Sequence, residues 1–298
     1  MGAKVIVFIG LYKNKYINSL GEKITISIST IIHNKMTTEI KSTLDFLSHV
    51  SKIRNAAIKN SNMNPSWVKV TTITITSKFS TSLDLQFLRE FFNKRPIVGL
   101  KSQQTKYVTE WKMSPTTFYN QISIYYDDHK SRKSVKLFPN GAIQVAGCSD
   151  MPECSRVMKQ IRSIVSYITK RKLTTTDFNV AMINTNFSLN SSVNLYEIFS
   201  VFNNAGYDTN YNPDRYAAVK VRIELIPGRF ITVSIFGSGK VIMTGARKLS
   251  EISSTYDIIM NIIRENQYSL LVEPTTTVEM FNLYRGVPIE QWLEKIST

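Results

Sequence analysis

The stretch Lys136-Leu-Phe-Pro-Asn-Gly-Ala-Ile-Gln-Val-Ala-Gly147 reappears 98 residues later as Ser234-Ile-Phe-Gly-Ser-Gly-Lys-Val-Ile-Met-Thr-Gly245. Three aromatic or glycine positions coincide: Phe138 with Phe236, Gly141 with Gly239, and Gly147 with Gly245. A match at one fixed offset without gaps indicates an internal repeat. The repeat therefore has to be established before any single helix or strand is assigned.

The repeat extends on both sides of this block. At the same offset Phe118 meets Tyr216 and Ile161 meets Ile259. Upstream, residues 75–80 match residues 183–188 at an offset of 108. The difference of ten residues falls between about residues 93 and 113, which predicts a longer loop in the first copy.

Each copy has the element order of a small α+β unit, and the second copy is the clearer one. β-rich runs predict strands, apolar residues at helical spacing predict helices, and Pro227-Gly228 marks a hairpin tip. The predicted strands are 178–184, 216–225, 230–236 and 241–244, and the predicted helices are 193–202 and 251–264, the latter matched by 153–169. Asn140-Gly141 is the strongest hairpin signal of the first copy.

We therefore predict an α+β fold built from two pseudo-symmetric β-α-β-β-β-β-α repeats. Helices cover one face of each antiparallel sheet unit, and the other face is left to bind something. The predicted segments are an N-terminal extension (1–66), repeat 1 (67–170), repeat 2 (171–263) and an acidic C-terminal tail (264–298).

The N-terminal extension reads as a strand followed by a helix. Ile24-Thr-Ile-Ser-Ile28 alternates like a half-buried strand, and 42–59 carries Leu44, Leu47, Val50 and Ile53 as a helical apolar stripe. The extension is an add-on that packs on the repeats, a degenerate half-repeat, or, if Met36 is the true start, in part not translated. We favour the first of these.

Composition and charge narrow the class of protein. The 298 residues are 43% hydrophobic and 20% charged, which excludes disordered and collagen-like chains. The net charge is +15, and residues 67–170 hold 16 basic against 7 acidic residues. This excess suggests a polyanion partner, most commonly nucleic acid, although a proteome rich in lysine, asparagine and isoleucine would give a similar bias.

Several other classes lack support in the sequence. The apolar run from Val5 to Leu11 is too short to span a bilayer, so we expect no membrane partner. Cys148 and Cys154 form no zinc or disulfide pattern, which indicates a reducing, intracellular compartment.

No catalytic constellation is present either. The three histidines are dispersed, and the HExxH, GxSxG and GxxxxGK[ST] motifs are missing. We therefore expect no catalytic residues, no metal, no cofactor and no enzyme activity.

Two blocks of the second copy resemble the TATA-box-binding protein family. They are Tyr-Asn-Pro-Asp-Arg-Tyr-Ala-Ala-Val at 211–219 and Phe-Gly-Ser-Gly-Lys-Val-Ile-Met-Thr-Gly-Ala at 236–246. The resemblance is strong over about 178–263, weaker over about 68–168, and does not cover 1–66 or the tail. It implies a saddle whose concave sheet binds and bends the DNA minor groove, with aromatic wedges at each end.

The resemblance also implies site residues. Asn184 and Thr244 match positions that read the minor groove, where short polar groups suit the few groups on A·T pairs. The wedge positions hold Tyr216 and Phe236 in copy two, placed on strands flanking the Pro227-Gly228 tip, and Phe118 and Phe138 in copy one. Further DNA contacts match the following residues: Arg215, Arg222, Arg229, Ser238 and Lys240.

The first copy departs from the family pattern. Thr117, Ile124, Ala142 and Ala146 stand in place of Arg215, Arg222, Lys240 and Thr244, and Thr76 stands in place of Asn184. A basic cluster of Lys130, Arg132, Lys133 and Lys136 either compensates on the phosphates or forms a solvated hairpin.

Two functions follow from these observations. One is a transcription initiation factor that binds and bends A·T-rich promoter DNA, with initiation factors and RNA polymerase as further partners. The other is a saddle-shaped interaction or scaffold subunit that has lost sequence-specific DNA binding. The first function places the protein in a nucleus, or in a viral factory or virion if the divergent lineage is a large DNA virus.

Overall fold

A computed structural model describes residues 16–17, 23–24, 28–60, 63–94, 97–98, 110–114, 118–127 and 132–272. The N-terminal part consists of β1 (Tyr16–Ile17), β2 (Lys23–Ile24) and α1 (Ile28–Asn60). Repeat 1 consists of β3 (Lys69–Lys78), α2 (Leu85–Lys94), β4 (Ile97–Val98), β5 (Glu110–Met113), β6 (Ile122–Asp127), β7 (Arg132–Leu137), β8 (Ala142–Cys148) and α3 (Met151–Thr169).

Repeat 2 has the same core order of elements and ends in a short tailpiece. It consists of β9 (Asn179–Ser188), β10 (Ser192–Val193), α4 (Leu195–Asn204), β11 (Asp208–Asn210), β12 (Ala218–Ile226), β13 (Arg229–Phe236), β14 (Lys240–Ala246) and α5 (Leu249–Glu265). The tailpiece is α6 (Gln267–Leu270) and β15 (Leu271–Val272), which pairs with β10. No helix among the described residues is long and apolar enough to cross a membrane.

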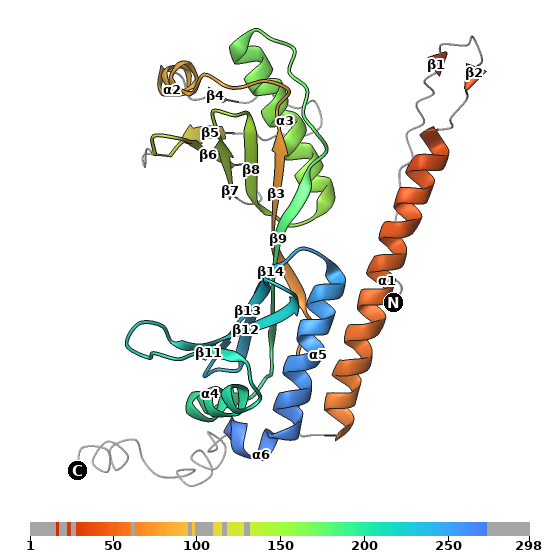
Figure 1. The fold of residues 1–298 in the computed structure, drawn as a ribbon, viewed down its shortest axis with the longest axis vertical. Helices are drawn as coiled ribbons and strands as arrows, with labels where there is room; N and C mark the ends of the chain where they lie inside the picture. The colour runs from red at the N-terminus through yellow and green to blue at the C-terminus, as the bar shows by residue number, and fades with distance from the viewer. Residues whose placement is uncertain are drawn as a thin grey trace, which may run out of the picture.

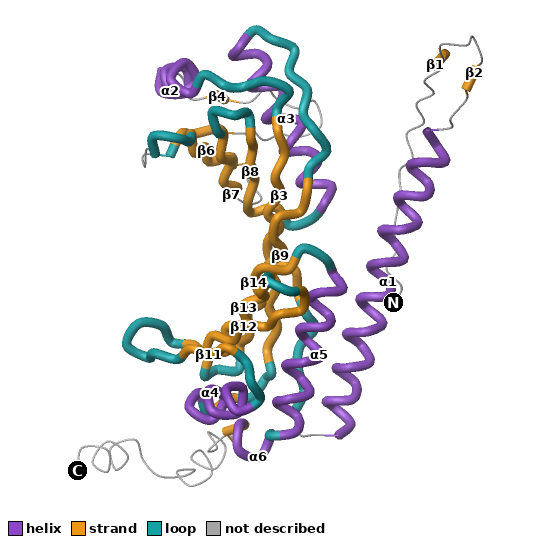
Figure 2. The backbone as a smooth tube through the Cα atoms, in the orientation of Figure 1, coloured by secondary structure: helices purple, strands orange, loops and turns teal. Residues whose placement is uncertain are grey.

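One antiparallel sheet of eleven strands runs through both repeats. Its order is β11-β12-β13-β14-β9-β3-β8-β7-β6-β5-β4, so the repeats join where β9 pairs with β3 (Figure 1). Figure 2 shows the strands as a continuous band with α3 and α5 along one side. The predicted α+β fold with two pseudo-symmetric halves and a single layer of helices is thus confirmed.

The core lies between the sheet and its helices. Buried apolar residues alternate along the strands, as in β12, where Val219, Val221 and Ile223 are buried. The amphipathic faces of α3 and α5 cover them with buried side chains such as Ile161 and Ile259, which are equivalent at the offset of 98. Both helices therefore owe their position to the repeated apolar pattern found in the sequence.

Strand register corrects one predicted offset, that between β3 and β9. Lys78 pairs with Ala142 and Ser188 pairs with Lys240, so these strands correspond at an offset of 110 rather than 108. The pair Ile73 and Ile183 shares this offset and so marks the pseudo-twofold axis. The prediction that Thr76 corresponds to Asn184 is therefore wrong, because Thr76 corresponds to Asn186.

Register corrects a second offset, between β6 and β12. Ser134 pairs with Tyr125, and its equivalent Thr232 pairs with Arg222, so the offset here is 97. A shift of one residue exchanges the two faces of a strand. Ile124 is buried and faces the helices, whereas Tyr125 stands where repeat 2 has Arg222, which contradicts the predicted replacement of Arg222 by Ile124.

The N-terminal helix differs from its prediction in where it begins and in which residues form its buried stripe. It begins at Ile28, inside the predicted strand, and its buried stripe is Phe46, Val50, Ile53 and Ala57. Leu44 and Leu47, predicted to join that stripe, are exposed at 60% and 47%. The helix packs along α5 (Figure 1), as an add-on to repeat 2.

Candidate nucleic-acid interface

The candidate site is the sheet face opposite α3 and α5, which we call the open face. Side chains of a strand point alternately to its two faces. In β12, Lys220 and Arg222 are exposed between residues that are buried toward the helices, so these two cations lie on the open face. The same alternation places Thr232 and Ser234 of β13 there, because they pair directly with Arg222 and Lys220.

A row of mostly polar residues crosses the open face of repeat 2 without a break. Each member is the direct register partner of the next, from one strand to its neighbour. The row, which we call the repeat-2 row, consists of Asn210, Lys220, Ser234, Ile242, Asn186 and Lys69. It spans six strands and ends on β3 of repeat 1.

The equivalent residues of repeat 1 form a shorter row. Direct register partners run from β6 through β7, β8 and β3 to β9. This repeat-1 row consists of Ser123, Lys136, Gln144, Thr76 and Asn179. Thr76 thus lies on the open face as a member of this row, and Lys136 is the member of the predicted basic cluster that joins it.

Asn184 lies next to the pseudo-twofold axis on β9. Its Nδ2 donates to Thr72 Oγ1 at 2.9 Å, and its backbone carbonyl accepts from Thr71 Oγ1 at 3.0 Å. Its Oδ1 is buried and has no hydrogen-bond partner among the described residues. The side chain is therefore anchored by the neighbouring repeat.

Thr244 and Lys240 lie two residues to either side of Ile242 in β14, so their side chains point to the open face as that of Ile242 does. Thr244 Oγ1 donates to the Thr232 carbonyl at 3.4 Å, and Lys240 is exposed. Ser238 is exposed in the turn before β14, and Arg215 is exposed in the turn before β12.

The aromatic residues predicted as wedges are not buried under the helices. Phe118 and Tyr216 are 61% and 39% exposed, and Phe138 and Phe236 are half-buried. The Tyr216 and Phe236 rings lie 5.8 Å apart, and Lys220 Nζ lies 4.3 Å from the Tyr216 ring centre. At the β6 offset of 97, the counterpart of Tyr216 is Tyr119, which is 90% exposed and which the sequence did not single out.

Tyr216 and Phe236 lie together as predicted, at the end of the β12–β13 hairpin that is remote from its tip. Ala218 pairs with Phe236, so Tyr216 and Phe236 lie at the open end of this hairpin. Pro227 and Gly228 form the tip at its opposite end.

Arg222 is already engaged on the open face. Its Nη1 lies 2.9 Å from Asp208 Oδ2, and its guanidinium carbon lies 4.0 Å from the Phe230 ring centre. Asp208 belongs to the edge strand β11 and is the direct register partner of Arg222. Both side chains are exposed, so the ion pair is weak and a phosphate could replace the carboxylate.

Arg229, predicted to contact DNA, faces the other way. Its guanidinium pairs with Glu251 of α5. In β13 it lies on the same side of the strand as the buried residues Ile231 and Val233. It therefore ties β13 to the helical layer.

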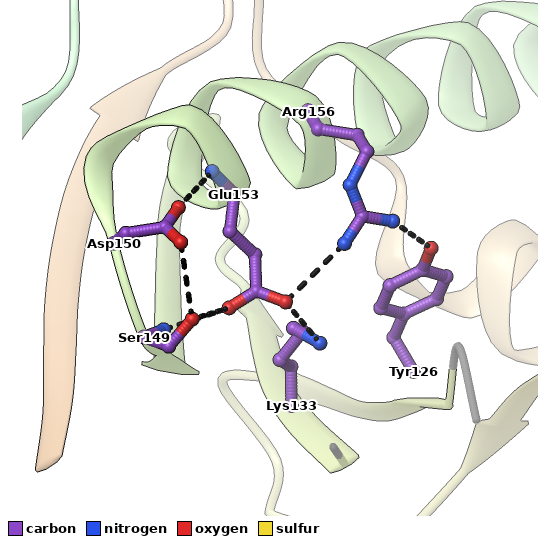
Figure 3. Close-up of polar contacts among 6 residues, drawn as sticks. All are labelled: Tyr126, Lys133, Ser149, Asp150, Glu153 and Arg156. Atoms are coloured by element: carbon purple, nitrogen blue, oxygen red, sulfur yellow. Dashed lines mark hydrogen bonds and ion pairs between the residues drawn. The ribbon is translucent and has the colours of Figure 1, made fainter. Parts of the chain in front are cut away.

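Repeat 1 has an equivalent ion pair between α3 and β7 (Figure 3). Lys133 Nζ lies 2.8 Å from Glu153 Oε1, and both side chains are buried. Glu153 also accepts from the backbone N–H and the hydroxyl of Ser149 at 2.7 and 2.9 Å. Burial alone would raise the pKa of Glu153, but these hydrogen bonds from Lys133 and Ser149 hold it below its ordinary value. Lys133 therefore fits neither alternative given for the basic cluster, because a buried lysine paired with Glu153 neither contacts phosphates nor belongs to a solvated hairpin.

A shallow groove of about 460 Å³ follows the open face of repeat 2. The groove is lined by several members of the repeat-2 row, by the ion pair of Arg222 with Asp208, and by their neighbours. The lining residues are Asp208, Asn210, Tyr216, Lys220, Arg222, Thr232, Ser234, Ile242 and Thr244. Sequence reasoning missed Asn210, Lys220, Ser234 and Asn186. For Lys220 and Ser234 the available signal was their place at alternate positions of predicted strands, whereas Asn186 and Asn210 lie outside the predicted strands. The described residues contain no group of three or more His, Cys, Asp or Glu side chains suited to a metal ion.

Comparison with known proteins matches repeat 2 to a family model and larger parts of the chain to individual proteins. Residues 177–266 match the family model of Transcription factor TFIID (or TATA-binding protein, TBP). A protein of Acanthamoeba polyphaga mimivirus described as TATA-box-binding protein-like is 24% identical over 254 residues, which cover 71% of this chain and 69% of that protein. The solved structure of Methanococcus jannaschii TBP aligns with a TM-score of 0.48 at 18% identity, covering 67% of this chain and 99% of its own. These comparisons show that residues 177–266, which form most of repeat 2, are similar to the TATA-binding protein family.

Proposed function

We propose that the open face binds A·T-rich duplex DNA through the minor groove and bends it, and that the protein acts as a TATA-box-binding-protein-like initiation factor. The observation that carries this proposal is the repeat-2 row. It runs unbroken over six strands of an uncovered sheet face, mainly in the segment that matches the family model.

The chemistry of the row suits a minor groove. A·T pairs offer only acceptors there, whereas G·C pairs add an amino group. Amide and hydroxyl groups such as those of Asn186, Asn210 and Ser234 can donate to these acceptors and are short enough for close contact. Lys220 and Lys69 add positive charge for the phosphates at either side.

We infer that the two halves bind unequally. Repeat 2 presents Lys220, Arg222 and Lys240 on its open face, whereas repeat 1 has no cation at the equivalent positions. The counterparts are Ser123, Tyr125 and Ala142, and the open-face cations of repeat 1, Lys78, Arg132 and Lys136, lie elsewhere on its strands. The aromatic side chains at both ends are exposed or half-buried, so they are accessible for partial insertion between base pairs. Initiation factors and RNA polymerase are the further partners that this function requires, in a nucleus or a viral factory.

Binding to labelled duplexes at fixed salt tests the proposal. The wild type should bind an A·T-rich duplex more tightly than a G·C-rich duplex of equal length. Asn186→Asp places a carboxylate among groove acceptors and should weaken A·T-rich binding by about tenfold or more. Asn203→Asp, an equal charge change at the exposed end of α4, is the matched control. Equal affinity for both duplexes, or equal losses in the two variants, would contradict the proposal.

The engagement of two predicted DNA contacts favours the scaffold alternative. Arg222 pairs with Asp208, and Arg229 pairs with Glu251. If the wild type binds neither duplex even at low salt, the sheet face serves protein contacts instead.

A further inference from the structure

The two rows of the open face differ at one pair of equivalent positions beside the centre of the sheet. Strands β8 and β14 flank the central strands β3 and β9 on opposite sides (Figure 1). Gln144 of β8 and Ile242 of β14 are equivalent at the offset of 98. Register supports this match, because Gln144 pairs with Lys136 and Ile242 pairs with Ser234, and these partners share the same offset. The two side chains therefore lie at mirrored places on the open face.

The Gln144 side chain is available to a ligand. It is half-buried and alternates with Ile143 and Val145, which are buried toward the helices. Its neighbours on the same face of β8 are Ala142 and Ala146, whose short side chains leave the space above the strand open. The Gln144 amide has no hydrogen-bond partner among the described residues. Its carbonyl oxygen and its NH₂ group can therefore both bind an incoming group.

Ile242 offers neither a donor nor an acceptor at the mirrored place. It is half-buried and lies between Lys240 and Thr244 on the open face of β14. The nearest amide of the repeat-2 row is Asn186, on the neighbouring strand β9, where repeat 1 has Thr76. Neighbouring strands lie about 4.8 Å apart, which exceeds the rise of about 3.4 Å per base pair. Ile242 and Asn186 therefore meet different base pairs of a duplex that lies along the row.

The difference matters because the minor groove distinguishes its base pairs by one amino group. A·T pairs present only acceptors there, and G·C pairs add the 2-amino group of guanine as a donor. Contact with Ile242 would take this amino group out of water without giving it an acceptor, which costs affinity. Gln144 can accept from the amino group through Oε1, or donate to the acceptors of an A·T pair through Nε2.

We propose that Gln144 lets the half of the DNA site under repeat 1 contain a G·C pair, whereas Ile242 restricts the mirrored position under repeat 2 to A·T. The inference rests on the proposed function, because both side chains act through a minor groove bound along the open face. The preferred duplex then has one half that requires A·T and one half that accepts guanine beside the centre. A single G·C pair at this place fixes which way round the protein binds.

Competition binding of the full-length protein to short duplexes tests this specificity. The reference duplex holds only A·T pairs, and G·C pairs replace two of them at mirrored positions that are moved outward together from the centre. At one such spacing, a duplex with one G·C pair should bind within about twofold of the reference, because only one of two orientations is lost. The duplex with both G·C pairs should bind about tenfold more weakly, a typical cost of one mismatched pair, because one guanine must then face Ile242.

Inosine separates the amino group from other properties of a G·C pair. Its base lacks the 2-amino group, so an inosine–cytosine pair presents only acceptors in the minor groove, as an A·T pair does. Replacing both guanines of the doubly substituted duplex with inosine should restore the affinity of the reference duplex.

Two variants assign the effect to these side chains, each measured relative to its own affinity for the all-A·T duplex. Gln144→Ile should make a single G·C pair cost about tenfold. Ile242→Gln should bind the doubly substituted duplex about as well as the reference. Gln86→Ile, the same change as Gln144→Ile on an exposed residue of α2, is the control and should keep the wild-type pattern. If Ile242→Gln impairs folding, Gln144→Ile and the inosine duplex decide the question.

Failure of the proposed function and failure of this inference give different results. If the wild type does not bind the all-A·T duplex, both are overturned. If the wild type binds that duplex but loses as much affinity at one G·C pair as at two for every spacing, this inference alone is overturned. The same holds if Gln144→Ile keeps the wild-type pattern, or if inosine fails to restore affinity.

Discussion

At the residue scale, Arg222 shows how the protein holds a cation in place on its open face. Asp208 Oδ2 lies 2.9 Å from the guanidinium, and the Phe230 ring supports it from one side. An exposed pair of this kind contributes under about 1 kcal/mol, so it orients the arginine more than it stabilises the fold. Asp208 then competes with any phosphate for Arg222.

Removing that competitor should strengthen DNA binding. We expect Asp208→Asn to raise affinity about threefold, in keeping with an exposed ion pair, and to make the slope of log affinity against log salt steeper by up to about 0.9, one phosphate contact. Asp214→Asn removes the same charge from an exposed turn and serves as the control. Titrations at several salt concentrations measure both quantities. If Asp208→Asn leaves affinity at the control's level, Arg222 does not contact phosphate.

A second residue-scale prediction concerns the buried carboxylates of α3 and α5. Glu153→Gln should lower the free energy of unfolding by about 3 kcal/mol, because it leaves Lys133 charged and buried. Glu251→Gln should cost less, since its partner Arg229 is partly exposed. Urea unfolding of the two variants measures this difference, and equal costs would contradict it.

The pH dependence of the same pair follows from its pKa shift. The folded pKa of Glu153 is lowered from 4.5, so its contribution to stability is fully present above that pH. The contribution is lost as the pH falls through the lower folded pKa. The stability difference between wild type and Glu153→Gln should therefore shrink in acid.

At the scale of elements, the hairpins between β7 and β8 and between β13 and β14 hold the repeat together. Gly141 and Gly239 have φ of +81° and +74°, and a Cβ on either would collide with a backbone carbonyl oxygen, of Thr81 or of Ser191. The Gly141 and Gly239 carbonyls accept from Phe79 N–H and Leu189 N–H. The glycines that coincide in the repeated sequence are thus required by the same close approach in both halves.

Alanine substitutions at two glycine turns should distinguish the cost of backbone strain at positive φ from the cost of a Cβ colliding with a backbone carbonyl oxygen. Gly239→Ala combines both and should cost about 3 kcal/mol or more. Gly228→Ala, at the β12–β13 tip, has φ of +73° but open space around it, and should cost about 1 kcal/mol. Thermal unfolding of the two variants ranks them, and the reverse order would show that the carbonyl contact does not constrain the turn.

The elements also show how far the sequence could predict the structure. The internal repeat follows from the match of residues at a fixed offset. The order of elements and the apolar faces of α3 and α5 follow from the local spacing of apolar residues. Register does not follow, because one extra residue before β6 exchanges the faces of this strand relative to β12 without disturbing the similarity of the strands. The pairing of Arg229 with Glu251 could not be predicted either, since it joins residues of different elements. A capping pattern was available for Glu153, which lies three residues after Asp150, the N-cap of α3.

At the scale of the whole molecule, the two halves share a backbone plan and differ in surface. Repeat 2 carries cations on the open face and a covering helix on its outer side, whereas repeat 1 carries cations both on the open face, as at Lys136, and on the outer side of α3. Exposed cations therefore lie on both the open face and the outer side of the helical layer.

The most direct test of the account is the bend in DNA, measured by energy transfer between the ends of a short, labelled A·T-rich duplex saturated with protein. We expect the wild type to raise the transfer. Tyr216→Ala with Phe236→Ala should reduce that rise while keeping most of the affinity at low salt, because phosphate contacts supply the affinity and ring insertion supplies the kink. A duplex that stays straight when bound by the wild type, or a bend that survives truncation of Phe118, Phe138, Tyr216 and Phe236 together, would contradict the central claim.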